Sequence, residues 1–143
     1  MNRFPAIVVA LIAALCLAPV LPASAKGDPS ARAQKLIDSG LAYLKTQQKP
    51  DGSWQNEKDP PAMTAIVLKA FVQDDKYDAK TDFVKRGYDK LLTYQLDDGG
   101  IYKDTLANYN TAIAVSALAA AEDPAYKPRI DKVTQLSCTK LAL

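Results

Sequence analysis

The feature that most constrains this chain is an internal repeat, in which a block of residues recurs 47 positions further along. Residues 40–54 read GLAYLKTQQKPDGSW and residues 87–102 read GYDKLLTYQLDDGGIY. Each block is followed by a similar apolar stretch, TAIVLKAF from residue 64 and TAIAVSAL from residue 111. Trp54 corresponds to Tyr102 if the second copy contains one inserted residue, Gly100. A period of this length predicts helical units that bury their apolar faces against one another.

Each unit contains two predicted helices of different character. Residues 31–47 and 83–95 place apolar side chains three and four positions apart, which predicts a surface helix with one buried stripe. The stripe residues are Leu36, Ile37, Gly40, Leu41 and Leu44 in the first helix and Val84, Gly87, Tyr88, Leu91 and Leu92 in the second. Residues 62–71 carry one charge and residues 110–121 carry none, which predicts helices covered on most sides. We therefore expect outer and inner helices to alternate, with no sheet.

Capping and turn residues agree with these helices. Residues 28–30, Asp-Pro-Ser, can start the first helix, and residues 60–61, Pro-Pro, suit the first turn of the second. Asn108 or Asn110 can cap the fourth helix. Residues 49–52 and 97–100 are predicted turns in which glycine takes a positive φ. A final helix is expected from Ile130 onward, although residues 133–140 contain poor helix formers.

The first 25 residues read as a secretory signal peptide. Arg3 is followed by an apolar stretch over residues 7–17 and by small residues at 23–25. An uncleaved membrane anchor is the alternative, but Pro19 and Pro22 interrupt the apolar run. We expect a domain over 26–143, exported to the periplasm or the extracellular space. Only Cys138 then remains, so no intrachain disulfide can form.

A Gly, an apolar residue, a Gln and a Gly-x-Trp at the end of a helix resemble the QW motif of squalene and oxidosqualene cyclases, whose repeats are related to those of protein prenyltransferase β subunits. The residues that carry this resemblance are Gly40, Leu44, Gln48, Gly52 and Trp54 in the first copy and Gly87, Leu91, Gln95, Gly99 and Tyr102 in the second. The resemblance implies an all-α fold of the α/α-toroid type, in which the Gln amide bonds to a neighbouring helix end and the aromatic ring stacks beside it. A Gln oxygen can also satisfy a free N–H at a helix start. Both arguments give Gln48, Trp54, Gln95 and Tyr102 structural roles.

The family's catalytic sites are missing from the sequence. The D-x-D-D segment of terpene cyclases is absent, as is the Gly-Cys-Gly-Glu-Gln string of thioester domains. The sequence has no His, so it cannot assemble the zinc site of prenyltransferases or a Ser-His-Asp or Cys-His site. The pairs Asp74-Asp75 and Asp97-Asp98 are predicted to be solvated turns, and Glu57 with Asp59 a solvated loop. We therefore expect no catalytic residue, no cofactor and no metal.

The charge pattern bears on the partners. The chain has 18 basic and 16 acidic residues without a basic block, which argues against a nucleic-acid partner. No segment beyond the signal is expected to span a membrane.

Taken together, the sequence predicts part of an α/α toroid. The first repeat covers about 31–73, the second about 82–121, and an incomplete third 127–143, as in a truncated or frame-shifted member of a longer family. The expected function is that of an exported, non-catalytic module that binds a ligand or partner through an inner face. The buried residues expected to shape this face are Met63, Ile66, Phe71, Ile113 and Leu118. A fragment of a terpene-cyclase-like enzyme and an α-solenoid scaffold are the alternatives, and open inner helices predict possible self-association.

Overall fold

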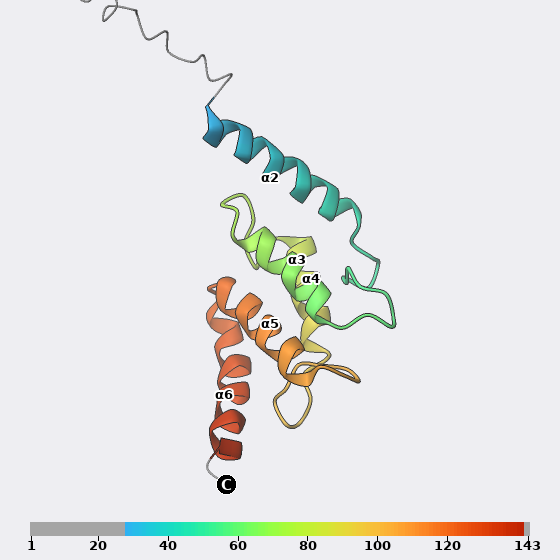
Figure 1. Cartoon of the computed structure of the whole chain (residues 1–143), viewed down its shortest axis with the longest axis vertical. Coiled ribbons are helices and arrows are strands. Elements are labelled where there is room, and N and C mark those ends of the chain that lie inside the picture. The colour runs from blue at the N-terminus through green and yellow to red at the C-terminus, as the bar shows by residue number, and fades with distance from the viewer. Residues whose placement is uncertain (1–27, 142–143) are drawn as a thin grey trace, which may run out of the picture. The chain divides into compact units, whose positions relative to one another are not determined.

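The computed structural model describes the backbone of residues 28–141 and the side chains of residues 28–134 (Figure 1). Over this range it is all-α, and the only β contact is an isolated bridge between Gln95 and Ile101. The helices are α2 (Pro29–Thr46), α3 (Ala62–Val72), α4 (Asp82–Leu92), α5 (Ala107–Ala120) and α6 (Lys127–Leu141), with a 3₁₀ turn at Pro124–Tyr126. The predicted signal peptide, residues 1–25, lies outside the described residues. Among the residues described, no helix has the length and hydropathy needed to cross a bilayer.

The chain divides into two units at the boundary between Gln34 and Lys35. In the first unit, α2 begins at Pro29, and the Ser30 N–H donates to Asp28 Oδ1 at 3.0 Å. This confirms the predicted helix start, since a carboxylate before a helix accepts from one of its free N–H groups.

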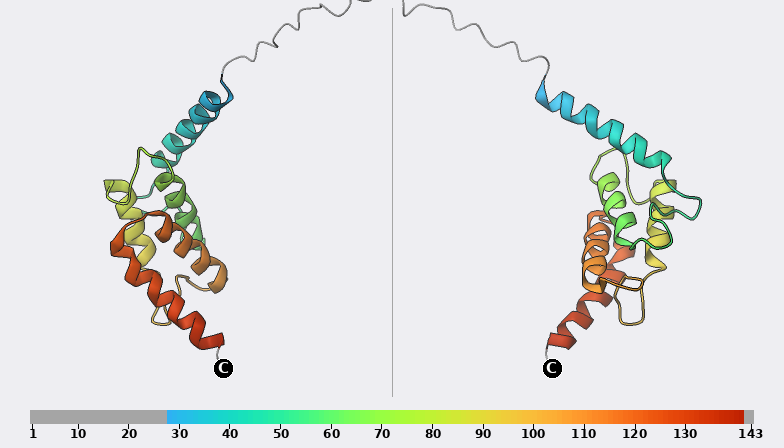
Figure 2. Two further views of the ribbon diagram at one scale, coloured as in Figure 1. Left: turned by 90° about the vertical axis from the view of Figure 1, so that its left-hand side faces the viewer. Right: turned by 45° about the vertical axis from the view of Figure 1, so that its right-hand side comes forward.

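The second unit is built around two inner helices, α3 and α5, which lie side by side (Figure 2). Lys69 of α3 donates to Ser116 Oγ of α5 at 2.7 Å. Near their starts, the Ala62 N–H donates to Asn110 Oδ1 at 3.3 Å. Helix α4 packs against α3, and α6 packs against α5. The buried core therefore lies between the inner helices and these two outer ones.

The four predicted helices are confirmed in order and place, with ends that differ by a few residues. The prediction of a helix cap at Asn108 or Asn110 is wrong. Helix α5 begins after Leu106, and Asn110 lies buried inside its first turn. Its Nδ2 donates to the Thr105 and Leu106 carbonyls at 2.9 and 3.1 Å. Its oxygen accepts from Ala62, so this amide pairs a free N–H at the start of α3 rather than one of its own helix.

The last helix also differs from the expectation. Helix α6 begins at Lys127, three residues before the predicted start, and its backbone continues through 133–140 to Leu141. It follows a 3₁₀ turn in which the side chain of Asp123 accepts from the Ala125 N–H. An (i, i+4) ion pair between Lys127 and Asp131 supports the first turns. These local contacts start the helix earlier than the apolar spacing alone indicates.

The apolar stripe of α2 is only partly buried. Leu41 is buried and Leu44 packs against the core, but Leu36 and Ile37 are 75% and 49% exposed. The prediction that these two residues share a buried stripe is wrong. Among the described residues, no helix covers that end of the stripe.

Candidate functional site: the helix junctions and the inner face

The two turns that follow α2 and α4 have the same backbone hydrogen bonds. In each turn, one residue donates to the carbonyl four positions ahead and its own carbonyl accepts from the glycine three positions ahead. These bonds are Lys49 N to Ser53 O and Gly52 N to Lys49 O in the first turn, and Leu96 N to Gly100 O and Gly99 N to Leu96 O in the second, all 2.8–2.9 Å. Gly52 and Gly99 have φ values of 89° and 79°, as predicted.

An aspartate closes each turn. Asp51 Oδ1 accepts from the Ser53 N–H at 3.0 Å, and Asp98 Oδ1 accepts from the Gly100 N–H at 2.9 Å. The hydrogen bonds from Ser53, together with Lys90 Nζ at 3.2 Å, lower the pKa of Asp51 to about 2. Asp51 is therefore ionised at neutral pH and bound within its turn, which makes it a structural group.

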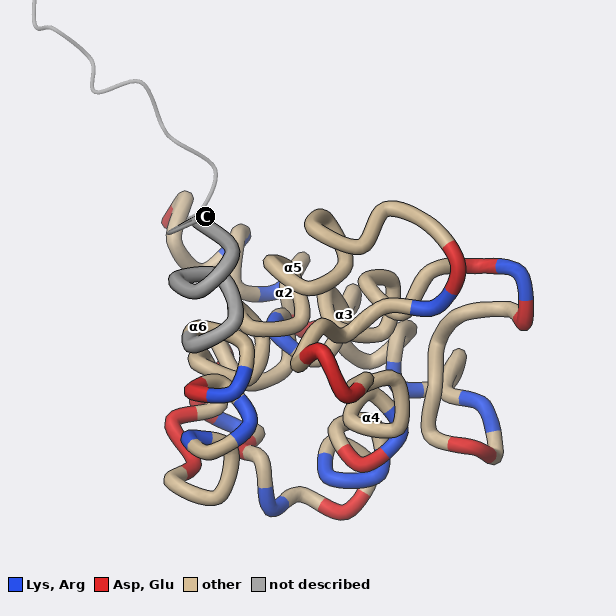
Figure 3. Tube along the Cα trace, turned by 90° about the horizontal axis from the view of Figure 1, so that it is seen from below, with Lys and Arg blue, Asp and Glu red and all other residues tan. Residues whose placement is uncertain are grey.

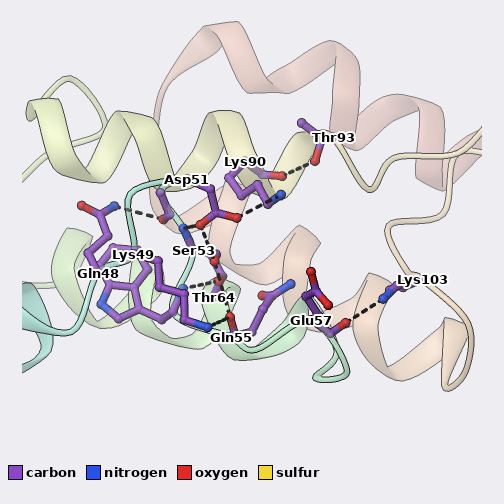
Figure 4. Close-up of polar contacts among 12 residues, drawn as sticks. Gln48, Lys49, Asp51, Ser53, Gln55, Glu57, Thr64, Lys90, Thr93 and Lys103 are labelled. Atoms are coloured by element: carbon purple, nitrogen blue, oxygen red, sulfur yellow. Dashed lines mark hydrogen bonds and ion pairs between the residues drawn. The ribbon is translucent and has the colours of Figure 1, made fainter.

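Gln48 connects the first turn to the next outer helix (Figure 4). Its Nε2 donates to the Phe83 carbonyl at 2.7 Å and to the Gly52 carbonyl at 3.0 Å. Arg86 donates to its Oε1 at 3.2 Å, which fixes the orientation of the amide. We expected the Gln oxygen to accept from a free N–H at a helix start. Instead, the amide nitrogen donates to a carbonyl in the first turn of α4.

Gln95 repeats this arrangement at the second turn. Its Nε2 donates to the Gly99 carbonyl at 3.3 Å and to the Arg129 carbonyl of α6 at 3.1 Å. The Arg129 side chain donates to Gln95 Oε1 at 3.1 Å. Each Gln therefore bonds to its own turn, to the backbone of the following outer helix and to an arginine on that helix.

Trp54 lies between α2, α3 and α4. Its Nε1 donates to the Leu44 carbonyl at 2.6 Å, and its backbone N–H donates to Thr64 Oγ1 at 2.9 Å. Its ring lies 5.9 Å from that of Phe71, centroid to centroid. The indole thus has both a packed body and a hydrogen-bonded tip.

Tyr102 does not take the place of Trp54 in the second copy. The residue whose N–H donates to the corresponding threonine is Ile101, at 3.0 Å from Thr111 Oγ1, and Ile101 is fully buried. Tyr102 is partly exposed, and its hydroxyl donates to Asp98 Oδ2 at 2.8 Å, which raises the pKa of Tyr102. The assumed one-residue insertion at Gly100 is wrong, because the spacing of ten residues to the following threonine is conserved. That spacing could have identified Ile101 from the sequence.

The two motif glycines on the outer helices have opposite surroundings. A Cβ on Gly87 would lie 2.6 Å from Leu68 Cδ2 and 2.9 Å from the Trp54 ring, whereas one on Gly40 would have no neighbour within 4 Å. Leu91, one turn after Gly87, is fully buried, and Leu44 is half-buried. Glycine is therefore required for close packing on α4 and not on α2.

The acidic residues considered for catalysis lie in turns. Asp74 Oδ1 accepts from the Lys76 N–H at 3.1 Å, and Asp59 Oδ2 accepts from the Asn56 N–H at 2.9 Å. Glu57 is exposed. Among the described residues, no three acidic or cysteine side chains group in a way that could ligate a metal ion.

One face of the inner helices is apolar and exposed. Met63 and Ile66 of α3 are 49% and 46% exposed, and Ile113 of α5 is half-buried. Leu106 and Tyr109, at the start of α5, are also exposed, and the sequence does not predict either. The prediction of buried residues is confirmed for Phe71 and Leu118, which belong to the core, and is wrong for Met63 and Ile66. The Phe71 ring lies 4.9 Å from that of Phe83 on α4, centroid to centroid, so it does not contribute to an exposed face.

No family model, curated protein or solved structure matches this chain.

Proposed function

We propose that this chain is an exported, non-catalytic helical-repeat module that binds an apolar helix of a partner polypeptide through the exposed face of α3 and α5. The observation that carries the proposal is the exposure of Met63 and Ile66 on α3 and of Tyr109 on α5, two helices that pack side by side, with Ile113 half-buried. Exposed apolar clusters of this kind mark interaction surfaces more often than chance exposure does.

The charge distribution favours an apolar partner. Helix α5 has no charged residue, and its tube is uncoloured in Figure 3. The single charge on α3, Lys69, is held by Ser116. Small residues on these helices, such as the half-buried Ala70 on α3 and the exposed Ala112 on α5, leave room for a helix with an apolar stripe to approach.

The likeness to prenyltransferase and squalene-cyclase repeats forms part of this proposal. It is supported by the matching junctions at Gln48 and Gln95, each joining a turn to the next outer helix. On this view the chain is a segment of an α/α toroid, and the face of α3 and α5 corresponds to the wall of the central cavity. The absence of the family's catalytic segments then favours binding without catalysis.

A peptide titration tests the proposed binding. The probe is a fluorescein-labelled amphipathic Leu/Gln helix of 14 residues, the length of α5, followed by fluorescence anisotropy. A neutral probe removes charge attraction as an explanation. Ile66→Ser should weaken its binding by about 10-fold, because the partner can no longer bury the isoleucine side chain.

Ile37→Ser is the matched control, since Ile37 on α2 has nearly the same exposure as Ile66, 49% against 46%. It should leave the affinity unchanged. Equal losses in both variants, or no loss in either, would refute a specific site on α3 and α5. Sedimentation of the purified chain separately reports self-association, and a dimer abolished by Ile66→Ser would identify a second copy as the occupant instead.

A further inference from the structure

A polar cavity lies on the loop side of the molecule, away from the residues that form the apolar face. Its volume is about 340 Å³, at the lower end of the range for small-molecule sites. It is lined by loop 49–57, by Lys90 and Tyr94 at the end of α4, and by Lys103 from the loop that precedes α5. Figure 4 shows these loop residues together with Lys90 and Lys103.

The lysines of this cavity are not equally neutralised. Lys90 forms an ion pair with Asp51 at 3.2 Å. Lys49, by contrast, donates to the Gln55 carbonyl at 2.7 Å and to Asn56 Oδ1 at 2.8 Å, both neutral oxygens. Lys103 donates to the Glu57 carbonyl at 2.6 Å and forms a long ion pair, at 3.9 Å, with the largely exposed Asp104. The lining thus holds three lysines against two carboxylates, those of Asp51 and Glu57, and Lys49 donates to neutral oxygens.

The cavity also contains hydrogen-bonding groups suited to hydroxyls. Gln55 is 5% exposed, and among the described residues its Oε1 is a buried side-chain oxygen without a hydrogen-bond partner. Buried polar groups without partners are uncommon, and because Gln55 lines the cavity, rotation of its amide toward the cavity would let a ligand hydroxyl satisfy this oxygen. Glu57, Asn56 and the Tyr94 ring complete a lining that combines acceptors, donors and an aromatic surface.

The turn does not need these polar residues for its own structure. The second turn forms the same backbone bonds with Leu96 in place of Lys49, Gly100 in place of Ser53 and Tyr102 in place of Gln55. The polar lining is therefore an addition to the common turn, which distinguishes a ligand site from ordinary loop packing.

We infer that the cavity between loop 49–57 and the end of α4 binds a small, hydroxyl-rich ligand that carries one anionic group, such as a sugar acid or a sugar phosphate. The anionic group lies against Lys103, and the hydroxyls bond to Gln55, Asn56 and Glu57 on the side of the cavity toward Lys49. This site is separate from the proposed peptide-binding face.

Isothermal titration of the purified full chain with four compounds tests the inference. The probes are glucuronate and glucose 6-phosphate, with glucose lacking the charge and acetate lacking the hydroxyls. At least one of the first two should bind about 10-fold more tightly than glucose or acetate, since a charge-assisted hydrogen bond contributes at that level. Comparing these two compounds shows whether a carboxylate or a phosphate is preferred.

Lys103→Met should weaken binding of the preferred compound by about 10-fold, because it removes one ammonium donor. Lys85→Met on the exposed surface of α4 is the matched control and should bind as the parent chain does. The inference is overturned if acetate binds as well as the sugar acid, if none of the four binds, or if both methionine variants lose affinity equally. A normal circular dichroism spectrum for each variant shows that the fold is intact.

Discussion

Helices α2 and α4 occupy corresponding places in the sequence repeat, yet the apolar face of α4 is buried and that of α2 is largely exposed. Leu36 and Ile37 of α2 are 75% and 49% exposed, whereas their counterparts on α4, Phe83 and Val84, are 7% and 0% exposed. This difference in burial depends on which helices pack against α2 and α4. Helix α4 packs against α3 and receives the Trp54 ring at Gly87, while no inner helix precedes α2 among the described residues. The same pattern therefore produces a buried stripe only where a preceding unit supplies the other half of the interface.

The most damaging change is expected on the covered side, at Trp54. Trp54→Ala should lower the free energy of unfolding by about 3–5 kcal/mol, because it removes the ring that packs on α4 and leaves a cavity. Urea denaturation followed by circular dichroism measures the change. Tyr43→Ala on the exposed side of α2 should alter it by less than about 0.5 kcal/mol. A loss below about 1 kcal/mol for Trp54→Ala would mean that the ring lies largely in solvent.

Alanine at the two motif glycines should have effects of opposite sign. Gly87→Ala should destabilise the fold by about 1–3 kcal/mol, since its Cβ would overlap Leu68 and the Trp54 ring. Gly40→Ala has open space around it and should stabilise α2 by up to about 1 kcal/mol through higher helix propensity. Thermal and urea unfolding of both variants can be compared directly. If both shift in the same direction, the two helix faces do not differ as described.

Tyr88 provides a test that depends on pH. It is fully buried, its hydroxyl donates to the Ala117 carbonyl at 2.8 Å, and burial raises its pKa. The folded state keeps Tyr88 neutral above pH 10, where the unfolded chain ionises. Its contribution to stability is therefore complete below about pH 10 and is lost as the pH rises further.

Tyr88→Phe should lower the free energy of unfolding by about 1 kcal/mol at neutral pH, and this variant should lose less stability than the parent chain between pH 9 and pH 11. Leu41, the counterpart on α2, has no hydroxyl and no such dependence. Identical alkaline profiles for the two proteins would contradict the assignment.

The smallest effect is expected at Asp51, which joins the first turn to Lys90 of α4. The pKa of Asp51 is lowered to about 2, so its stabilising contribution is present above its ordinary pKa of 3.8 and is lost as the pH falls toward 2. The carboxyl group is half exposed, which reduces the effect to about 1 kcal/mol or less. Acid titration of the unfolding free energy should show a smaller drop in Asp51→Asn than in the parent chain. A steeper drop in the variant would exclude this role.

Much of the local structure could be predicted from the sequence. The spacing of apolar residues predicted the helices, and the turn residues predicted the positive φ of Gly52 and Gly99. Both features depend on residues close together in the chain. For Gln48 and Gln95, the sequence predicted only that each amide bonds to a helix end. The prediction that the amide oxygen accepts was wrong, because in both cases the amide nitrogen donates to a backbone carbonyl. The role of Ile101 was not predicted, because Trp54 was aligned with Tyr102, the other aromatic residue, rather than with the residue ten positions before Thr111.

The polar cavity could not be predicted, because Lys103 reaches loop 49–57 only through its hydrogen bond to the carbonyl of Glu57, 46 residues away in the chain. The exposure of Leu36, Met63 and Ile66 could not be predicted either. Periodicity determines which residues of a helix share a face, and so the sequence alone determined helices, turns and the register of the repeat. Which face meets another helix depends on neighbours distant in the chain, and only the tertiary structure decided that.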